Sequence, residues 1–186
     1  MEHSITVNKL EYQVEKLLGK GKGGYSYLVH DDRGQYVLKQ IHHEPCDYYE
    51  FGDKMQAEIA DYKKLKECGI NMPSLLDVDL ENERILKTYI EGQTIYEIVE
   101  HGEMLSDYID QIKEMTRKIY PRKINIDYFP TNFVVNNGAI WYIDFECNEY
   151  MDEWNFENWG IKYWSKTKEF QDYVKKQRKS SELENK

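Results

Sequence analysis

Cysteine and proline are scarce in this sequence of 186 residues, and long apolar runs are missing. The three cysteines (Cys46, Cys68 and Cys147) are odd in number, lie far apart and form no CxxC pair. This argues against a disulfide or zinc framework and favours a reducing cytosol, so we expect a cytoplasmic protein. No apolar run approaches the roughly 18 residues of a membrane-spanning helix, and the first residues carry charges where a signal peptide needs an apolar core. Basic residues are also few, 25 against 34 acidic ones, and the net charge of −9 disfavours non-specific nucleic-acid binding.

Strand-like segments dominate the first half of the chain. Met55, Ile59, Tyr62 and Leu65 recur at helical spacing and predict one helix over 53–68. Alternating or β-branched and aromatic runs bounded by turn residues predict five strands. These predicted strands cover 12–18, 25–29, 36–41, 74–80 and 84–90.

Helical patterns are commoner in the second half. A stripe from Ile109 to Ile119 predicts a helix over 105–119, and aromatic residues recur at helix-compatible spacing over 154–174. Asn136-Asn137-Gly138 is typical of a hairpin turn, here between strands 133–135 and 139–145. We therefore predict an α+β fold with two lobes, residues 1–90 with an antiparallel sheet and one helix, and residues 91–186 with a small, mainly helical structure.

A glycine-rich segment in the first half is a candidate phosphate-binding loop. Residues 19–24 (GKGKGG) satisfy GxGxxG, a weak signal alone because glycines also simply make turns. Strand-like residues follow the segment, whereas a Rossmann fingerprint opens a helix. Lys39 ends the next strand, and Glu58 lies on the predicted helix, where a carboxylate can pair with the lysine and direct its ammonium toward a nucleotide.

The strongest signal lies in the second half. Asp127 and Asn132 share a short loop, and Asp144 lies at the end of the predicted hairpin. Phosphoryl transfer uses a carboxylate to accept or orient the attacking hydroxyl, and hard oxygen ligands to hold Mg²⁺. These residue types at these spacings therefore predict a phosphotransferase site.

Taken together, the motifs resemble those of the protein-kinase-like superfamily. GKGKGGYSYLV is similar to the glycine loop, YVLK to the VAIK strand, NIDYFPTNFVV to the catalytic loop HRDLKPENIL, and YIDFE to DFG. The pieces follow the family's order and its approximate separations over residues 17–146. The resemblance implies a bilobal kinase-like fold with ATP bound between the lobes.

The resemblance also implies a role for each matching residue on the nucleotide side. Lys39, held by Glu58, would contact the α- and β-phosphates. The backbone from Thr88 to Ile90 would contact the adenine. The glycines that would cover the phosphates are Gly19, Gly21 and Gly24.

On the catalytic side, the resemblance makes Asp127 the catalytic base and gives Asn132 and Asp144 the role of Mg²⁺ ligands. The sequence departs from the family pattern at Asn125, which replaces the catalytic-loop histidine, and at Glu146, the last residue of the DFG-like motif. Lys87 falls near a position that usually lines the adenine pocket with an apolar side chain.

The second lobe is short for a typical protein kinase. Only 42 residues follow Asp144, and no APE motif occurs among them. The chain therefore resembles the small atypical kinases more closely: RIO-like enzymes, the tRNA-modification-associated kinase or a trimmed aminoglycoside-phosphotransferase relative. A reduced lobe suggests that the platform for the substrate is small or that a protein partner supplies it.

We therefore expect an ATP- and Mg²⁺-dependent enzyme that phosphorylates a hydroxyl, with Ser/Thr of a protein as the favoured acceptor. One alternative is a small cationic substrate, which the acidic and aromatic stretch 144–157 would suit. A second alternative, from another class, is a pseudokinase that binds the nucleotide and acts by docking. The presence of all five candidate residues (Lys39, Glu58, Asp127, Asn132 and Asp144) argues against it.

Overall fold

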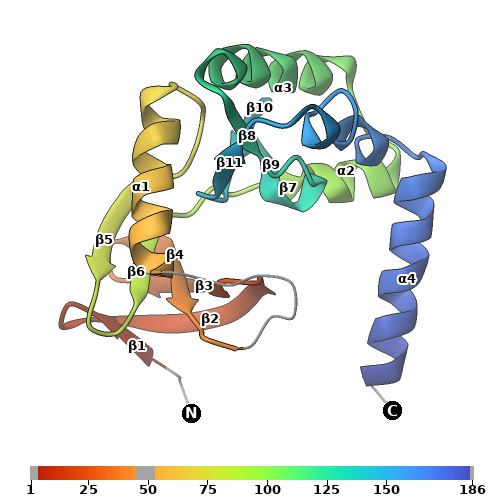
Figure 1. Ribbon diagram of the computed structural model, residues 1–186. Coiled ribbons are helices and arrows are strands. Elements are labelled where there is room, and N and C mark those ends of the chain that lie inside the picture. The colour runs from red at the N-terminus through yellow and green to blue at the C-terminus, as the bar shows by residue number, and fades with distance from the viewer. Residues whose placement is uncertain (1–3, 45–52, 185–186) are drawn as a thin grey trace. The chain divides into compact units, whose positions relative to one another are not determined.

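The structure is a computed structural model that describes residues 4–44 and 53–184. Its contacts divide the chain into two compact units. The first comprises Met1–Lys64 and Pro73–Ile90, and the second comprises Leu65–Met72 and Glu91–Lys186. As predicted, the chain has an α+β fold, with one antiparallel sheet and a helix followed by a second unit that contains further helices, and this arrangement fits a kinase-like fold (Figure 1).

The first unit is built on a six-stranded antiparallel sheet, with strand order β1-β2-β3-β4-β6-β5. One face of the sheet carries a core of buried side chains (Val7, Tyr12, Val29, Leu38 and Leu86). The strands are β1 (Ser4–Val7), β2 (Leu10–Lys20), β3 (Gly24–Asp31), β4 (Gly34–Ile41), β5 (Leu75–Asp79) and β6 (Arg84–Thr88), and the helix is α1 (Lys54–Glu67). The helix lies within the predicted range 53–68, and its stripe residues Met55 and Leu65 are buried.

The prediction of five strands was wrong, because β1 adds a sixth. This strand has four residues, and it pairs with β2 across a tight turn at Asn8-Lys9. Both turn residues have positive φ, 44° for Asn8 and 73° for Lys9. Lysine seldom adopts this conformation, so the turn gave no recognisable signal in the sequence.

A buried carboxylate ties this first strand to the opposite edge of the sheet. Asp79, at the end of β5 and only 3% exposed, accepts hydrogen bonds from the backbone N–H of Asn8 at 2.9 Å and from that of Asn82 at 2.9 Å. The Asn82 side chain adds a third at 3.0 Å. These bonds stabilise the charged form and lower the pKa of Asp79 from 3.8 to about 2.

We expect this carboxylate to make stability depend on acid pH. Because its pKa is lowered in the folded state, its contribution is complete above about pH 4 and disappears as the pH falls toward 2. The melting temperature of the wild type should fall steeply across that window. Asp79→Asn should melt lower at pH 7 and show a flatter profile, whereas Asp32→Asn, at an exposed turn position, should follow the wild type. Parallel acid profiles for Asp79→Asn and the wild type would contradict this assignment.

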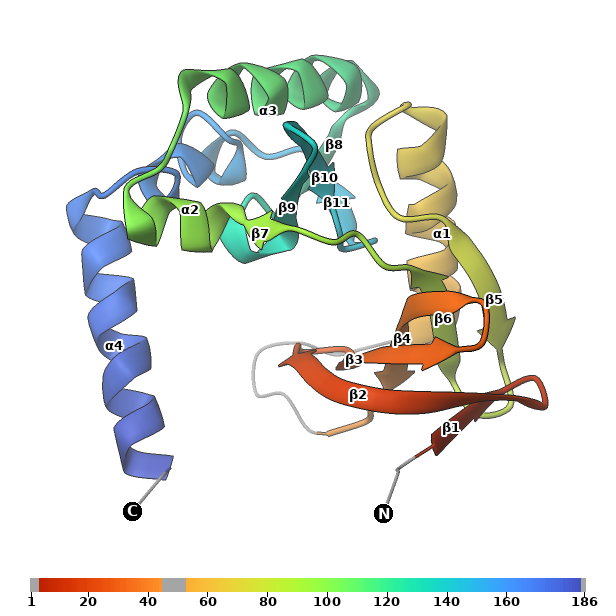
Figure 2. The same ribbon diagram turned by 180° about the vertical axis from the view of Figure 1, so that it is seen from behind.

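The second unit combines short strands with helices (Figure 2). Its sheets have the orders β10-β9-β7 and β11-β8. Their strands are β7 (Gln93–Thr94), β8 (Ile124–Ile126), β9 (Phe133–Asn136), β10 (Ala139–Tyr142) and β11 (Cys147–Glu149). The α-helices are α2 (Ile95–His101), α3 (Ser106–Ile119) and α4 (Lys168–Glu184). Helix α4 packs against α2 through Tyr96, whose ring lies 5.4 Å from that of Phe170 and 6.1 Å from that of Tyr173.

Most predicted elements of this unit are present with changed limits. Helix α3 matches the predicted helix, and the Asn136-Asn137-Gly138 turn joins β9 to β10, with positive φ at Asn137 and Gly138. Strand β10 ends at Tyr142, three residues earlier than predicted, although the N–H of Ile143 still donates to the carbonyl of Asn132 in the same register.

The aromatic segment 154–174 is not one helix, which corrects the prediction. It contains the short 3₁₀ turns Asp152–Trp154 and Gly160–Tyr163, and α-helix begins only at Lys168. Helix α2 was missed altogether. Its signal was available in the sequence, because Thr94 and Glu97 form a reciprocal capping box, and Gly102 ends the helix with φ of 82°.

Candidate functional site

The glycine segment forms the tip of the β2–β3 hairpin rather than interrupting the strands. Strand β2 continues to Lys20, which pairs with Tyr25, and two register shifts accommodate Gly19 within the strand. The N–H of Gly21 then donates to the carbonyl of Gly24 at 2.9 Å. Lys22 and Gly23 therefore lie at the tip, and the predicted phosphate-binding glycines lie in β2, at the turn and at the start of β3.

Gly24 also has a packing reason to be glycine. A Cβ at this position would lie 2.5 Å from the carbonyl oxygen of Gln40, so a side chain would push β4 away. The end of β4 also holds the hairpin tip, since the N–H of His42 donates to Gly23 at 3.2 Å and its Nε2 lies 3.1 Å from the Gly21 carbonyl oxygen. The backbone and side chain of His42 therefore help to fix the shape of the loop.

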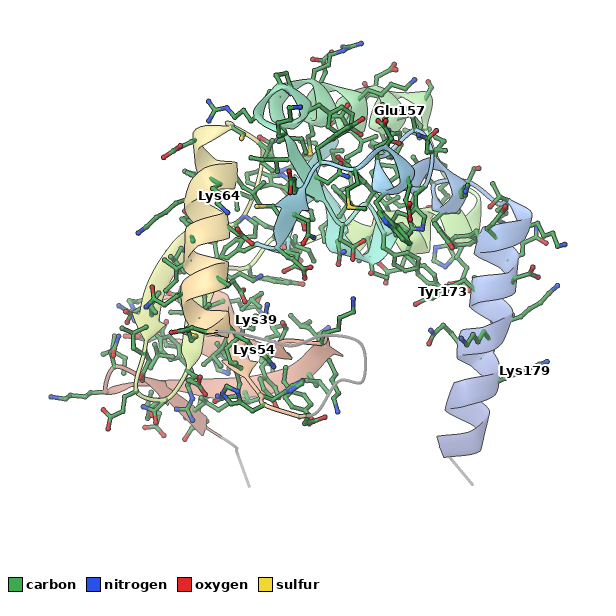
Figure 3. All side chains as sticks on the ribbon, viewed as in Figure 1. Lys39, Lys54, Lys64, Glu157, Tyr173 and Lys179 are labelled. Carbon is green, nitrogen blue, oxygen red and sulfur yellow. The ribbon has the colours of Figure 1, made fainter. Side chains whose placement is uncertain are left out.

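Lys39 and Glu58 form the ion pair predicted from the sequence. The Lys39 Nζ lies 2.6 Å from Glu58 Oε2, with side chains 16% and 9% exposed. Lys39 lies on β4 between Ser26 of β3 and Ile85 of β6, and Glu58 lies on α1. Figure 3 shows Lys39 beside the first turns of this helix.

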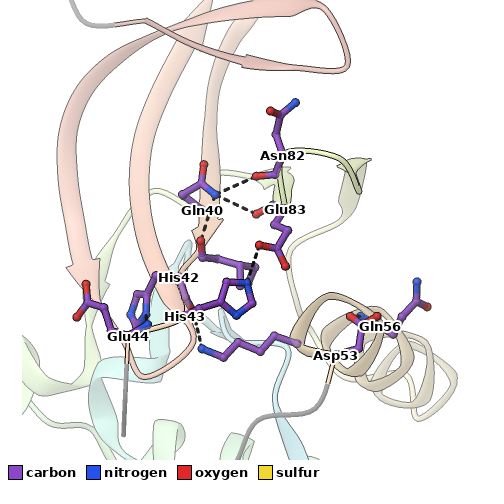
Figure 4. A network of polar contacts seen from close by, with 10 residues as sticks. Gln40, His42, His43, Glu44, Asp53, Gln56, Asn82 and Glu83 are labelled. Atoms are coloured by element: carbon purple, nitrogen blue, oxygen red, sulfur yellow. Dashed lines mark hydrogen bonds and ion pairs between the residues drawn. The ribbon is translucent and has the colours of Figure 1, made fainter.

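A second lysine fixes the start of α1 near this pair. Lys54 is 8% exposed, and its Nζ donates to the carbonyl of His42, just beyond the end of β4 (Figure 4). The same strand end is held on its other side, where Gln40 Nε2 donates to the carbonyl of Asn82 at 3.0 Å. Lys54 therefore links the helix that carries Glu58 to the strand that carries Lys39.

The proposed adenine-contacting segment lies at the end of β6. Thr88 closes the strand, and its N–H donates to the carbonyl of Ser74 at 3.0 Å, while Ile90 follows outside the ladder. Lys87 is buried, at 5% exposed, and pairs with Val37, two residues before Lys39 on β4. Because alternate residues of a strand share a face, Lys87 and Lys39 lie on the same face of the sheet.

In the second unit, a tight turn follows Asp127. The N–H of Phe129 donates to Asp127 Oδ1 at 3.0 Å, and the side-chain NH₂ of Asn132 donates to the Asp127 carbonyl at 3.3 Å. The backbone bond from Ile143 to Asn132, 2.9 Å long, brings the segment that carries Asp144 beside the same loop. The structure therefore gathers Asp127, Asn132 and Asp144 in one place.

Tyr142 is a buried residue whose pKa both acids affect, and sequence reasoning missed it. This phenol is completely buried and donates to the carbonyl of Glu146 at 2.7 Å. Burial raises the pKa of Tyr142 well above 10.0, and the negative charges of Asp144 and Asp127 raise it further. Both carboxylates thus act on a single buried phenol, and its position in a strand of apolar residues gave no sign of this in the sequence.

The donor atoms of the loop suit a hard divalent cation. Mg²⁺ prefers carboxylate and amide oxygens and binds through few protein ligands together with phosphates and water. The hydrogen bond from Asn132 fixes which end of its amide is nitrogen, and the other end is the oxygen that such an ion needs. Within residues 4–44 and 53–184, no group of three or more His, Cys, Asp or Glu side chains is arranged to hold a metal.

No protein-family model matches the chain. Over 89 residues it is 33% identical to the probable bifunctional tRNA threonylcarbamoyladenosine biosynthesis protein of Methanococcus vannielii, a match that covers 47% of the chain and 16% of that relative. A protein of the same description from Methanococcus maripaludis strain C7 is also 33% identical over 89 residues. The KEOPS complex subunit Bud32 of Pyrococcus abyssi is 29% identical over 94 residues, covering 48% of the chain and 42% of the relative. The chain spans less than half the length of the relatives that it matches.

These similarities indicate which of the small atypical kinases the chain resembles. Of the small atypical kinases, the one associated with tRNA modification is the class to which the relatives point. Two further observations concern membrane-spanning helices and cysteines, which the sequence analysis also considered. None of the helices in the described part of the chain is long and apolar enough to cross a membrane. Cys68 is a buried free thiol, and Cys46 lies outside the described residues.

Proposed function

We propose that the chain is a kinase-like enzyme that uses ATP and Mg²⁺ to transfer a phosphoryl group. The observation that carries this proposal is the Lys39–Glu58 ion pair, 2.6 Å long and largely shielded from water. Lysines on strands are ordinarily solvated, so a buried one fixed by a helix carboxylate indicates a task for its charge. The similarity to Bud32 supports the same class.

The first unit carries the groups suited to the phosphates of the nucleotide. The glycine hairpin (Gly19, Gly21 and Gly24) would cover the phosphates with its backbone, and Lys39 would neutralise their charge. The backbone from Thr88 to Ile90 offers hydrogen bonds to the adenine edge. Glu58 orients the Lys39 ammonium and does not touch the nucleotide.

The second unit carries the groups suited to the reaction itself. Asp127 accepts the proton of the acceptor hydroxyl, whose oxygen then bonds to the γ-phosphorus while the bond to the bridging oxygen of ADP breaks. Asn132 and Asp144 would hold Mg²⁺, which when bound neutralises charge on the phosphates. Catalysis then rests on positioning and charge, with no covalent intermediate on the protein.

For the acceptor, we propose Ser or Thr of a protein. A protein partner would complete the platform for this substrate, and the similarity to a KEOPS complex subunit supports such a partner. The names of the relatives favour a second candidate, a role in an assembly that modifies tRNA, for which we propose water as the acceptor of the phosphoryl group. In that case the net charge of −9 favours contact with a protein subunit over direct contact with RNA.

The test is incubation of the full chain with γ-labelled ATP, with Mg²⁺ or with EDTA, in the presence and absence of casein as a protein acceptor. We expect Mg²⁺-dependent release of label into protein or into inorganic phosphate. Label in casein or in the chain itself supports the protein kinase, and label in phosphate alone supports the ATPase. ATP binding without any turnover would overturn the enzyme in favour of a docking module, and absence of ATP binding would overturn the nucleotide site.

A further inference from the structure

Hydrogen bonds connect the loop that carries Asp127 to a segment near the end of the chain. We call residues 151–164 the cradle segment. Its first residue accepts a hydrogen bond from Asn125, since the Asn125 Nδ2 donates to the carbonyl of Met151 at 3.0 Å. Asn125 is 3% exposed and precedes the loop, so the residue that departs from the kinase pattern anchors one end of it.

Trp164 holds the middle of the same loop. Its indole Nε1 donates to the carbonyl of Tyr128 at 2.8 Å, and both side chains are completely buried. The indole is itself wedged between two rings, with centroids 5.3 Å away at Phe156 and 5.1 Å away at Phe133. An aromatic ring fixed on two sides presents its N–H in one direction only.

Gly160 makes this close approach possible. A Cβ at this position would lie 2.6 Å from the Cβ of Tyr128 and 2.9 Å from a ring carbon of Phe156. Any side chain there would displace the loop or the Phe156 ring. The 3₁₀ turn Gly160–Tyr163 then carries the chain directly to Trp164.

The bond made by Trp164 acts on Asp127 through a single peptide group. The carbonyl of Tyr128 and the N–H of Phe129 belong to the same planar peptide. The indole N–H of Trp164 donates to the oxygen of this peptide. The N–H of the same peptide, which belongs to Phe129, donates to Asp127 Oδ1 at 3.0 Å. Because the peptide is planar, the bond to the Tyr128 oxygen also fixes the direction of the Phe129 N–H, and this N–H orients the Asp127 carboxylate.

We propose that Trp164 is a positioning residue for Asp127, acting through the Tyr128–Phe129 peptide plane, and that Gly160 is the clearance that allows it. This inference rests on the proposed function for its effect on rate. It also has a structural consequence that is independent of catalysis, namely protection of the Phe129 amide.

The test uses Trp164→Phe, which keeps an aromatic ring and removes the N–H, with Trp154→Phe as the matched control in the same segment. Trp154 is 47% exposed. For Trp164→Phe we expect kcat to fall about 10- to 100-fold while KM for ATP stays within about twofold, because small misplacements of a catalytic group cost rate rather than binding. Hydrogen exchange at the Phe129 amide should be faster in the Trp164 variant and unchanged in the Trp154 variant.

A second replacement keeps the proposal testable if Trp164→Phe unfolds. A 3-benzothienylalanine at position 164 has the shape of tryptophan with sulfur in place of the N–H, and it should show the same loss of kcat with wild-type thermal stability. An unchanged kcat and unchanged Phe129 exchange in a folded variant would overturn the inference. A wild type that turns over no ATP would defeat the proposed function alone, because the exchange measurement still decides whether Trp164 holds the loop.

Discussion

Replacing Asp127 by asparagine is expected to remove phosphate transfer while leaving the fold and ATP binding intact. Asparagine has the same shape, and its side-chain oxygen can still accept the N–H of Phe129 that now binds Asp127 Oδ1 at 3.0 Å. What it lacks is the basicity to accept a proton from the acceptor. General-base contributions are about 10²- to 10⁴-fold in rate, so kcat should fall by that amount.

The measurement is the initial rate with γ-labelled ATP, alongside the dissociation constant for ATP from calorimetry. Asp110→Asn is a suitable control, because Asp110 is an exposed carboxylate on α3 in the same unit. We expect the control to retain wild-type rate, and both variants to bind ATP within about twofold of the wild type. If Asp127→Asn still transfers phosphate, Asp127 is not the base, and the proposal that its loop is catalytic is wrong.

The elements that periodicity could reveal were predicted well from the sequence. Helices α1 and α3 repeat apolar residues at helical spacing, and the Asn136-Asn137-Gly138 turn has the residues that positive φ requires. Strand β1 and the 3₁₀ turns of the cradle segment were not predicted. They are too short to show a repeat of apolar residues, and tertiary contacts determine their conformation. Short elements of this kind are stabilised by what they pack against rather than by their own propensity.

The site shows the same division between local and distant information. The Lys39–Glu58 pair was predicted because both residue types occur at the spacing of a known motif, and the structure contains it. The hold of Trp164 on the Tyr128 carbonyl joins residues 36 positions apart, and no local pattern marks it. Sequence motifs therefore predicted the candidate residues and the Lys39–Glu58 contact, whereas the contacts that hold the Asp127 loop emerged only from packing.

The Lys39–Glu58 pair provides the second large effect, which a double-mutant cycle can isolate. Lys39→Met should lower kcat/KM about 10²-fold or more, the size of effect seen when one preorganised donor to a charged group is removed. Glu58→Gln should lower it for a different reason, because the Lys39 ammonium, 2.6 Å from Glu58 Oε2, loses its orientation. If Glu58 acts only through Lys39, the double variant is no worse than Lys39→Met, and the two single effects do not add.

Lys64→Met is the matched control for this cycle. Lys64 lies on α1 with Glu58 and pairs with Asp61 at 2.9 Å, but its side chain is 58% exposed. Because the lysine of this pair is solvent-exposed, the pair should contribute about 0–1 kcal/mol, and the control should keep wild-type kcat/KM and nearly the wild-type melting temperature. Lys39→Met leaves the Glu58 carboxylate, 9% exposed, without the ammonium it pairs with, and should cost about 1–3 kcal/mol of unfolding free energy in urea.

Additive losses of kcat/KM in the double variant would mean that Glu58 contacts the nucleotide independently of Lys39. Equal effects of Lys39→Met and Lys64→Met would mean that Lys39 has no catalytic task.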